Sequence, residues 1–239
     1  GGDGSDIMIG DAGNDYLEGG AGFNYYIAGL GDDYIVDLSS SLSQVFYSIS
    51  STDVDLSALS TNDGLSSISD HMPGAIVIFP SDVPHEQQVS KYKTSTEAGD
   101  RFGVDYLEGV EQIVGSTGDD IIYTAAGINQ TIFGREGNDQ LITLGSTDND
   151  IYGGAGDDLF ISSPDAKDTF FGGDGNDTVR IWGDNNVGFG VDGDLFFGHE
   201  NRQKTTSDID TLDFSQSNYS WHMYFNPVSS GVLTGKSPL

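Results

Sequence analysis

The 239-residue chain has no cysteine, and it carries only 9 lysines and arginines against 38 aspartates and glutamates. Without cysteine, neither a disulfide framework nor a thiolate metal site can form. The formal net charge of −29 argues against a surface that binds nucleic-acid phosphates. No apolar run approaches the ~20 residues that a membrane-spanning helix needs, and we expect no N-terminal secretory signal peptide. We therefore expect no nucleic-acid partner and no membrane span.

Sequence motifs of enzymes are missing as well. His85 and Glu86 begin like the zinc-protease motif HExxH, but Val89 stands where the second histidine is required. Neither a GxSxG elbow nor a GxxxxGK[ST] phosphate loop occurs. Paired acids such as Asp148 and Asp150 could serve a glycosidase, but the sequence identifies no cleft beside them. We predict that the chain is not an enzyme, and we name no catalytic residue.

What the chain has in abundance is a nine-residue unit. All units but one have at least two glycines in their first four places, and every unit has Asp or Asn in the sixth place and an apolar residue in the eighth. The first block holds four rows, and five more follow after an interval: GGDGSDIMI (1–9), GDAGNDYLE (10–18), GGAGFNYYI (19–27), AGLGDDYIV (28–36), GSTGDDIIY (115–123), GREGNDQLI (134–142), GGAGDDLFI (153–161), SPDAKDTFF (163–171) and GGDGNDTVR (172–180).

One row predicts a turn followed by a short strand. Six residues rich in Gly, Asp and Asn make a turn whose backbone can take positive φ, which only glycine does freely. The three residues that follow span roughly 10 Å as a strand, which is too short to be stable alone. Such strands become stable when rows stack and their eighth-place side chains form a continuous interior. Those side chains are Met8, Leu17, Tyr26, Ile35, Ile122, Leu141, Phe160, Phe170 and Val179.

The sixth-place acids predict a bound cation. Rows on one side of such a roll lie about 4.8 Å apart, and two unit charges roughly 4 Å apart repel by about 4 kcal/mol at an effective dielectric constant of about 20. A column of carboxylates is therefore unfavourable unless cations lie between the rows. Oxygen donors, with no Cys or His at the repeating place, favour Ca²⁺ over Zn²⁺ or Mg²⁺. The candidate ligands are Asp6, Asp15, Asp33, Asp120, Asp139, Asp158, Asp168 and Asp177, with Asn24 as a weaker one.

The pattern GGxGxDxUx, in which U is apolar, resembles the RTX family, the haemolysin-type calcium-binding repeats of proteins exported by Gram-negative bacteria. The resemblance implies a parallel β-roll that binds several Ca²⁺ ions, and type I export by a C-terminal signal. It also implies that turn carbonyls complete each calcium shell. The glycines that would supply them are Gly2, Gly4, Gly13, Gly20, Gly22, Gly29, Gly31, Gly118, Gly137, Gly154, Gly156, Gly173 and Gly175.

The repeat divides the chain into four segments and predicts an all-β fold, a parallel β-roll (β-solenoid) in two blocks. Residues 1–36 form the first block and 115–197 the second. Residues 37–114 break the period and are expected to be an irregular β insertion, or connector, packed on the roll; 198–239 are expected to be a connector and capping segment. Strands in the interval are expected at 45–49, 54–56, 75–79, 104–107 and 110–114.

The second block contains irregular rows. Row 124–133 has an extra residue and no acid, and another extra residue follows about twenty positions later. Depending on the frame, Asn149 or Asp150 then occupies the sixth place, and Asp150 is retained as a candidate ligand. Row 163–171 has Ser, Pro and Ala where glycines belong, so metal binding by Asp168 stays open. Each extra residue shifts the frame of the repeat, which we call a slip, and is expected to weaken or delete one calcium site.

Two further features concern the surface. Arg101, Asp105 and Glu108 lie close together in the connector; a surface salt bridge is the preferred interpretation, and a carbohydrate or ion site is the alternative. The seventh and ninth places of the first block are mostly apolar or aromatic, and we expect the interval, the C-terminal segment or another chain to cover them. These residues are Ile7, Ile9, Tyr16, Tyr25, Ile27, Tyr34 and Val36.

Three functions are consistent with these features. The first is a non-catalytic calcium-binding module of a secreted bacterial protein, which folds on binding Ca²⁺ outside the cell. The second is a segment of a surface adhesin or surface-layer-like assembly. The third is an accessory module of a secreted enzyme such as a protease, lipase or alginate epimerase. The expected partners are calcium ions and the remainder of a longer parent protein, with further copies of the chain or a surface polysaccharide as candidates. The expected location is extracellular or on the surface of a Gram-negative cell.

Overall fold

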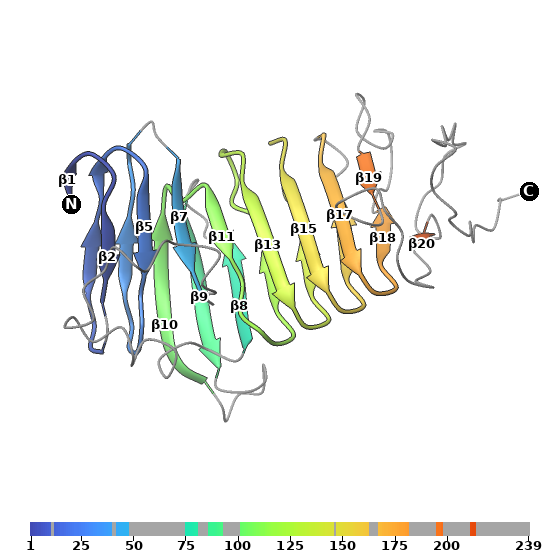
Figure 1. Ribbon diagram of the computed structural model, residues 1–239, viewed down its shortest axis with the longest axis horizontal. Coiled ribbons are helices and arrows are strands. Elements are labelled where there is room, and N and C mark those ends of the chain that lie inside the picture. The colour runs from blue at the N-terminus through green and yellow to red at the C-terminus, as the bar shows by residue number, and fades with distance from the viewer. Residues whose placement is uncertain are drawn as a thin grey trace, which may run out of the picture.

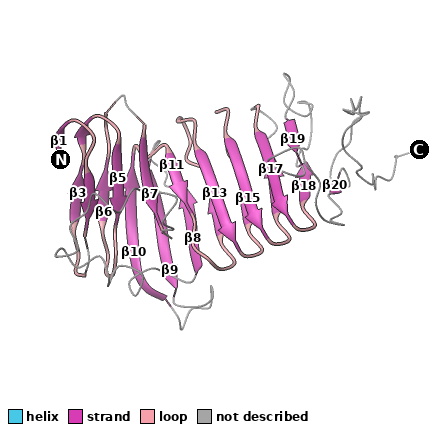
Figure 2. Ribbon diagram, in the orientation of Figure 1, coloured by secondary structure: helices cyan, strands magenta, loops and turns pink. Residues whose placement is uncertain are grey.

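The computed structural model describes residues 1–10, 12–39, 42–47, 75–80, 86–92, 101–145, 147–162, 167–181, 195–197 and 211–213. In these ranges the chain forms twenty strands joined by turns, and no helix (Figures 1 and 2). No helix in the described part is long and apolar enough to cross a membrane.

The strands form two main sheets, and successive coils of the chain lie side by side along the long axis of the molecule (Figure 1). The ten-stranded sheet contains, in spatial order, β3 (Tyr16–Glu18), β6 (Tyr34–Val36), β10 (Arg101–Glu108), β9 (Glu86–Tyr92), β8 (Ala75–Pro80), β12 (Ile121–Tyr123), β14 (Gln140–Ile142), β16 (Leu159–Ser162), β18 (Thr178–Ile181) and β20 (Thr211–Asp213). The eight-stranded sheet contains β2 (Ile7–Ile9), β5 (Asn24–Ile27), β7 (Ser43–Phe46), β11 (Gln112–Val114), β13 (Thr131–Glu136), β15 (Asp150–Ala155), β17 (Thr169–Asp174) and β19 (Leu195–Phe197). The short strands β1 (Gly2–Asp3) and β4 (Gly20–Ala21) pair with each other.

The core lies between the two main sheets and is made by the eighth-place side chains, as the sequence predicts. Seven of the nine are fully buried in one cluster, while Met8 and Leu17, in the first coil, are partly buried against it. Strands without a regular row extend the same core with Val45, Ile113 and Ile151. Because most of the described strands have only two to four residues, the core depends on stacking. The predicted all-β parallel roll is confirmed.

The interval contributes strands to the roll's own sheets. β7 and β11 pair in parallel between β5 and β13, and β10 pairs in parallel with β6. β9 was not expected from the sequence, and it pairs antiparallel with both β8 and β10. The expected strand at 54–56 lies outside the described residues.

The slips of the second block form a regular pattern. Stacked equivalent residues are 18 apart in the first block and 19 apart in the second. The extra residue always falls in the turn that leads from the ten-stranded to the eight-stranded sheet, as from β12 to β13 and from β14 to β15. The turns that lead back into the ten-stranded sheet therefore keep the nine-residue row.

The outer faces of the two sheets differ. On the eight-stranded sheet Ile27, Phe46 and Val114 are buried in a second apolar cluster. On the ten-stranded sheet Tyr16 and Tyr34 are 63% and 37% exposed and stack with a ring-centroid distance of 5.7 Å. Of the seven residues expected to be covered, Ile27 and Val36 are buried and Ile7, Ile9 and Tyr25 are partly buried, whereas Tyr16 and Tyr34 remain open to solvent in the single chain.

The C-terminal part is described only at two strands. β19 ends the segment FGVDGDLFF (189–197), which keeps the nine-residue pattern imperfectly, and it pairs with β17. β20 pairs with β18 at the end of the ten-stranded sheet. β20 therefore covers the edge of β18, and the capping role of residues 198–239 stays a prediction. The other residues of 198–239 lie outside the described ranges.

Candidate metal centres in two columns of turns

The sixth-place residues stack in two columns, one at the entry to each main sheet. The turns that enter the ten-stranded sheet carry Asp15, Asp33, Asp120, Asp139, Asp158 and Asp177. Together with Asp105, which lies within β10 beside Asp33, they form the Asp column. The residues at the entry to the eight-stranded sheet form the mixed column, which consists of Asp6, Asn24, Ser43, Glu111, Gln130, Asn149 and Asp168. The columns share the fold but differ in side-chain chemistry.

In the Asp column one carboxylate oxygen is used to join successive turns. Oδ1 of Asp158 accepts the backbone N–H of Asp139 at 2.9 Å, and Oδ1 of Asp177 accepts that of Asp158 at 3.0 Å. The same bond links Asp15 to Asp33 at 3.0 Å. Each aspartate thus holds the preceding turn in register, because the bond requires both turns to stack directly.

The second oxygen is left without a partner in several of these turns. Oδ2 of Asp15, Asp139 and Asp158 is buried and has no hydrogen-bond partner among the described residues. This oxygen lies beside the glycine at the first place of its own row: a Cβ at Gly134 or Gly153 would collide with it. A buried polar atom without a partner is costly, so this arrangement fits a hard cation that binds the free oxygen.

Burial changes the protonation of these acids. Desolvation, with a smaller contribution from neighbouring Asp120, raises the pKa of Asp139 to about 9. Desolvation also raises the pKa of Asp158 to about 7, although the hydrogen bond from the Asp139 backbone opposes the shift. Without a cation these carboxyl groups therefore tend to keep a proton near neutral pH, whereas a bound divalent cation would favour the ionised form.

The glycines at the fourth place give these turns their shape. Gly137, Gly156 and Gly175 take φ values of 118°, 138° and 133°, which side-chain-bearing residues rarely adopt. A Cβ at Gly156 would collide with the carbonyl oxygen of Gly137 in the turn before it. Arg135 occupies the second place of its row with a φ of 90°. The turns are thus stacked too closely for side chains at the fourth place.

Asp120 is an exception in the Asp column. Its Oδ2 accepts the backbone N–H of Ser116 at 2.7 Å, and its Oδ1 accepts the Ser116 hydroxyl at 2.6 Å and the N–H of Ile76 at 2.7 Å. The Ser116 hydroxyl takes part in bonds with Gly118 as well. Burial raises the pKa of Asp120 to about 7. Both oxygens are satisfied by the protein, so this turn has less need of a cation than its neighbours.

In the mixed column, amide groups supply the missing donors. Nδ2 of Asn24 donates to the carbonyl oxygens of Gly20 and Gly22, each at 3.3 Å, and to Oδ2 of Asp37 at 3.0 Å. These glycine carbonyls are ones that the family resemblance assigns to calcium. The Asn24 turn can therefore form without a cation.

The same use of amides recurs further along the mixed column. Nδ2 of Asn149 donates to the Thr147 carbonyl at 2.8 Å and to Oδ1 of Asp168 at 2.9 Å. Nε2 of Gln130 donates to Gln87 and to the Val110 carbonyl, both at 2.8 Å. Asn149 therefore occupies the column position that the sequence left open, and Asp150 is an exposed residue at the start of β15.

A separate ladder runs through the exposed fifth places. Asn138 N–H donates to Oδ1 of Asp119 at 2.7 Å, Asp157 N–H to Oδ1 of Asn138 at 2.8 Å, and Asn176 N–H to Oδ1 of Asp157 at 2.8 Å. Aspartate and asparagine alternate along this ladder, so the charges are separated by a neutral residue. The buried sixth places of the same turns have only aspartate.

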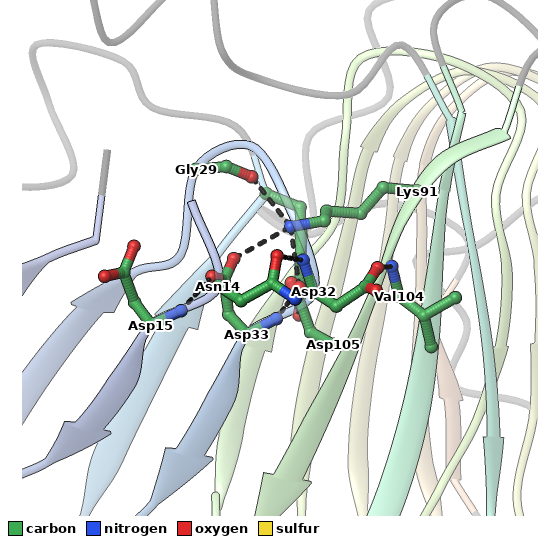
Figure 3. Close-up of polar contacts among 9 residues, drawn as sticks. Asn14, Asp15, Gly29, Asp32, Asp33, Lys91, Val104 and Asp105 are labelled. Atoms are coloured by element: carbon green, nitrogen blue, oxygen red, sulfur yellow. Dashed lines mark hydrogen bonds and ion pairs between the residues drawn. The ribbon is translucent and has the colours of Figure 1, made fainter. Parts of the chain in front are cut away.

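The first half of the Asp column contains a protein cation (Figure 3). Nζ of Lys91, on β9, lies 3.0 Å from Oδ2 of Asp33 and 2.6 Å from Oδ1 of Asp105, and all three side chains are buried. Desolvation raises the pKa of Asp105 to about 7 in spite of the lysine. The preferred interpretation of Asp105 as part of a surface salt bridge is therefore wrong, since its partner is the buried Lys91, whereas Glu108 accepts a hydrogen bond from the Tyr34 hydroxyl.

Asp105 could have been found from the sequence. The four residues from Asp105 to Glu108 read DYLE, as do those from Asp15 to Glu18, and the two strands both pair with β6 in the same register. Lys91 had no such signal, because β9 presents Gln87, Val89 and Lys91 on its inner face. With one apolar residue among the three, that face does not show a strand pattern.

Among the described residues, no three His, Cys, Asp or Glu side chains converge on a point where they could hold a metal ion. An ion in the Asp column would therefore take most of its ligands from turn carbonyls. Beside the mixed column lies a groove, which the sequence did not identify, lined by Asp148, Asp150 and Lys167 among others. Asp148 accepts the backbone N–H of Lys167 at 3.0 Å, which is a turn-forming use of this acid.

Comparison with protein families finds the RTX calcium-binding nonapeptide repeat in four copies, at residues 1–35, 105–141, 128–160 and 165–188. The second copy begins at Asp105, in agreement with its place in the Asp column. Comparison with curated proteins finds no match. The repeats, the stacked turns and the buried sixth-place acids agree, and the chain belongs to the RTX calcium-binding repeat family.

Proposed function

We propose that the chain is a calcium-binding β-roll module of a secreted protein, in which Ca²⁺ bound along the Asp column drives folding. The single observation that carries this proposal is the set of buried carboxylate oxygens without partners, at Asp15, Asp139 and Asp158. Such oxygens destabilise a roll without ions and become ligands when Ca²⁺ is present. The module itself carries out no catalysis.

The sites that the structure supports best lie between the turns 134–139, 153–158 and 172–177. Each of these turns opens a nine-residue row and contains a fourth-place glycine with positive φ and a buried sixth-place aspartate. The candidate ligands are the carboxylates of Asp139, Asp158 and Asp177, with the turn carbonyls of Gly137, Gly154, Gly156, Gly173 and Gly175. The turn at 10–15, with Asp15 and Gly13, offers a further position. The bound ion would supply positive charge between carboxylates and fix the turns in place.

Calcium binding can supply enough free energy to act as a folding switch. Extracellular-type sites bind Ca²⁺ with dissociation constants of about 10⁻⁴ to 10⁻³ M. Each ion bound only by the folded state adds about 2.7 kcal/mol at a hundredfold excess over its dissociation constant. Several ions therefore match the roughly 5 to 15 kcal/mol by which domains are usually stable. A chain that is unfolded at low calcium concentration would fold where calcium is plentiful, which is the expected behaviour of an exported protein.

The experiment is a calcium titration followed by circular dichroism, with Mg²⁺ as the control ion. We expect the β signal to increase strongly with Ca²⁺ and not with Mg²⁺ at the same ionic strength. The Asp139→Ala/Asp158→Ala variant should need more calcium and bind fewer ions than the parent chain. A β signal that is unchanged by chelator at low ionic strength would refute the proposal.

A second candidate function is a segment of a surface adhesin or surface-layer-like assembly. It is favoured by the exposed tyrosines on the ten-stranded sheet, where Tyr34 stacks with both Tyr16 and Tyr106 at 5.7 and 6.1 Å. This role requires association through that face, with another copy or a surface polysaccharide. Size measurement in calcium separates the candidates, since a chain that stays monomeric at high concentration cannot build an assembly alone.

A further inference from the structure

We call the space between two neighbouring aspartates of the Asp column a gap. In one gap the protein itself supplies the cation. In the gap between Asp33 and Asp105, Nζ of Lys91 contacts a carboxylate oxygen from each side, and it also donates to the carbonyl oxygen of Gly29 at 2.7 Å (Figure 3). Gly29 and Asp33 stand at the second and sixth places of the same row. The ammonium group therefore contacts the kinds of atoms that the proposed calcium ion would contact in other gaps.

The carboxylates of this gap differ from those of the neighbouring turns in being satisfied. Oδ2 of Asp33 binds Lys91, whereas the equivalent oxygen of Asp15 has no hydrogen-bond partner among the described residues. Oδ2 of Asp105 accepts the hydroxyl of Tyr47 at 3.1 Å, and its Oδ1 also accepts the Asp33 backbone N–H at 3.2 Å. All four oxygens in this gap thus have partners from the protein alone.

The local backbone is arranged to admit the lysine. β9 runs antiparallel to its neighbours, so its end reaches the side of the sheet where the parallel strands begin, and Lys91 stands opposite Gly103 on β10. A Cβ at Gly103 would lie 2.9 Å from Cε of Lys91 and would collide with the Gly31 carbonyl. Gly103 therefore leaves the space through which the lysine stem reaches the turn.

From these contacts we propose that the ammonium group of Lys91 takes the place of a calcium ion between Asp33 and Asp105, so that this junction of the first block with the interval forms without calcium. Removal of the lysine head group uncovers a site for one Ca²⁺ ion. The second statement rests on the proposed calcium function of the other gaps, whereas the first does not.

The calcium-independent part is tested by hydrogen exchange in excess chelator. In the parent chain we expect amides of β6, β9 and β10 to keep protection while those at 134–181 lose it. Lys91→Met should lose the protection at the junction, because two buried carboxylates remain without their cation. Adding Asp33→Asn and Asp105→Asn to that variant should restore it. Equal protection in the parent chain and in Lys91→Met, or no protection in either, overturns the proposal.

The calcium-dependent part is tested by counting bound ions with titration calorimetry. Lys91→Ala should bind one more Ca²⁺ per chain than the parent, and the Lys91→Ala/Asp33→Asn/Asp105→Asn variant should return to the parent number. Lys167→Ala, which removes an exposed lysine, is the matched control and should leave the count unchanged. A folded Lys91→Ala chain with the parent number of ions contradicts the assignment. If the parent chain binds no calcium, the proposed function fails, and the exchange experiment alone decides the role of Lys91.

Discussion

The two columns of turns show two ways to satisfy the same backbone arrangement. In the mixed column, Asn24, Gln130 and Asn149 turn amide donors toward carbonyl and carboxylate oxygens. In the Asp column, Asp139 and Asp158 have only acceptor atoms, and their second oxygen has no partner among the described residues. An amide completes its turn at any ion concentration, whereas Asp139 and Asp158, which lack the serine donors of Asp120, complete theirs only with a cation or a proton. We therefore expect the requirement for calcium to lie mainly at one edge of the roll.

Removal of calcium should produce the largest difference between the two columns. Each ion at a hundredfold excess contributes about 2.7 kcal/mol, so loss of several ions should unfold the coils that contain 134–139, 153–158 and 172–177. We expect hydrogen exchange to show loss of protection in β14, β16 and β18 on addition of chelator, and its return with Ca²⁺. Protection that persists in these strands would show that the Asp column is stable without ions.

The stability of the calcium-free roll should fall as pH rises. The pKa of Asp139 is raised to about 9 and that of Asp158 to about 7 from an ordinary value of 3.8. The folded state then binds more protons than the unfolded state between about pH 4 and 9, so the stability that these protons contribute is lost progressively as the pH rises through that window. In chelator the β signal in circular dichroism should therefore be larger at pH 5 than at pH 8. In saturating calcium the trend should weaken or reverse, because protons compete with the ion.

Exchanging the chemistry of the two columns should exchange their calcium dependence. Asp158→Asn keeps an acceptor for the Asp139 N–H and gains a donor like that of Asn24. In chelator it should therefore be more stable than the parent, by about 1 to 3 kcal/mol for relief of a buried unpaired group, and it should bind fewer ions. The measurements are the β signal that each chain keeps in chelator and the urea unfolding midpoint in Ca²⁺.

The reciprocal variant is Asn149→Asp, which replaces the donor to Asp168 with a like charge. It should be less stable than the parent in chelator and should recover in part with Ca²⁺. If both variants shift the free energy of unfolding in the same direction under both conditions, the two columns do not differ in their need for a cation.

The first-place glycines should be sensitive in the Asp column. Gly134→Ala places a Cβ against Oδ2 of Asp139 and against the Gly153 carbonyl oxygen, and such overpacking typically costs about 1 to 3 kcal/mol. We expect a lower thermal midpoint and weaker calcium binding. Gly2→Ala is the matched control, since no atom lies within 4 Å of its Cβ position, and it should leave both unchanged.

The smallest expected effect concerns the exposed tyrosines. Tyr16→Ala removes a ring that stacks on Tyr34, with an angle of 5° between the rings, and aromatic pairs contribute about 0.5 to 1.5 kcal/mol. Because the stack lies on the outer face of the sheet, the loss should be near the lower value and equal with and without Ca²⁺. An effect on calcium affinity would show that the outer face and the turns are coupled.

The parts of this fold that could be predicted are those in which local sequence repeats. The eighth-place residues predicted the core, since an apolar residue in phase with a glycine turn can face only the interior. The sixth-place acids were predicted because they repeat in phase with the same glycines. The DYLE segment that ends at Glu108 carried enough information to add Asp105. The role of Asn149 needed the structure, because an inserted residue shifts the frame and only stacking against Gln130 and Asp168 selects the register.

The least predictable part was the interval. β9 has one apolar residue on its inner face, and its antiparallel course interrupts a sheet that is otherwise parallel. Burial of Lys91 depends on acids that are far away in sequence, at Asp33 on one side and Asp105 on the other. A lone lysine in a polar segment gives no sign of such partners.

The sequence by itself determined that this protein is a stacked roll of glycine turns with acids in phase, because the nine-residue period forces each element to repeat the geometry of the last. Only the tertiary structure decided which acids need a cation. That need is set by what lies beside each carboxylate, whether an amide, a hydroxyl, Lys91 or no donor, and those neighbours come from turns and strands that the period does not connect.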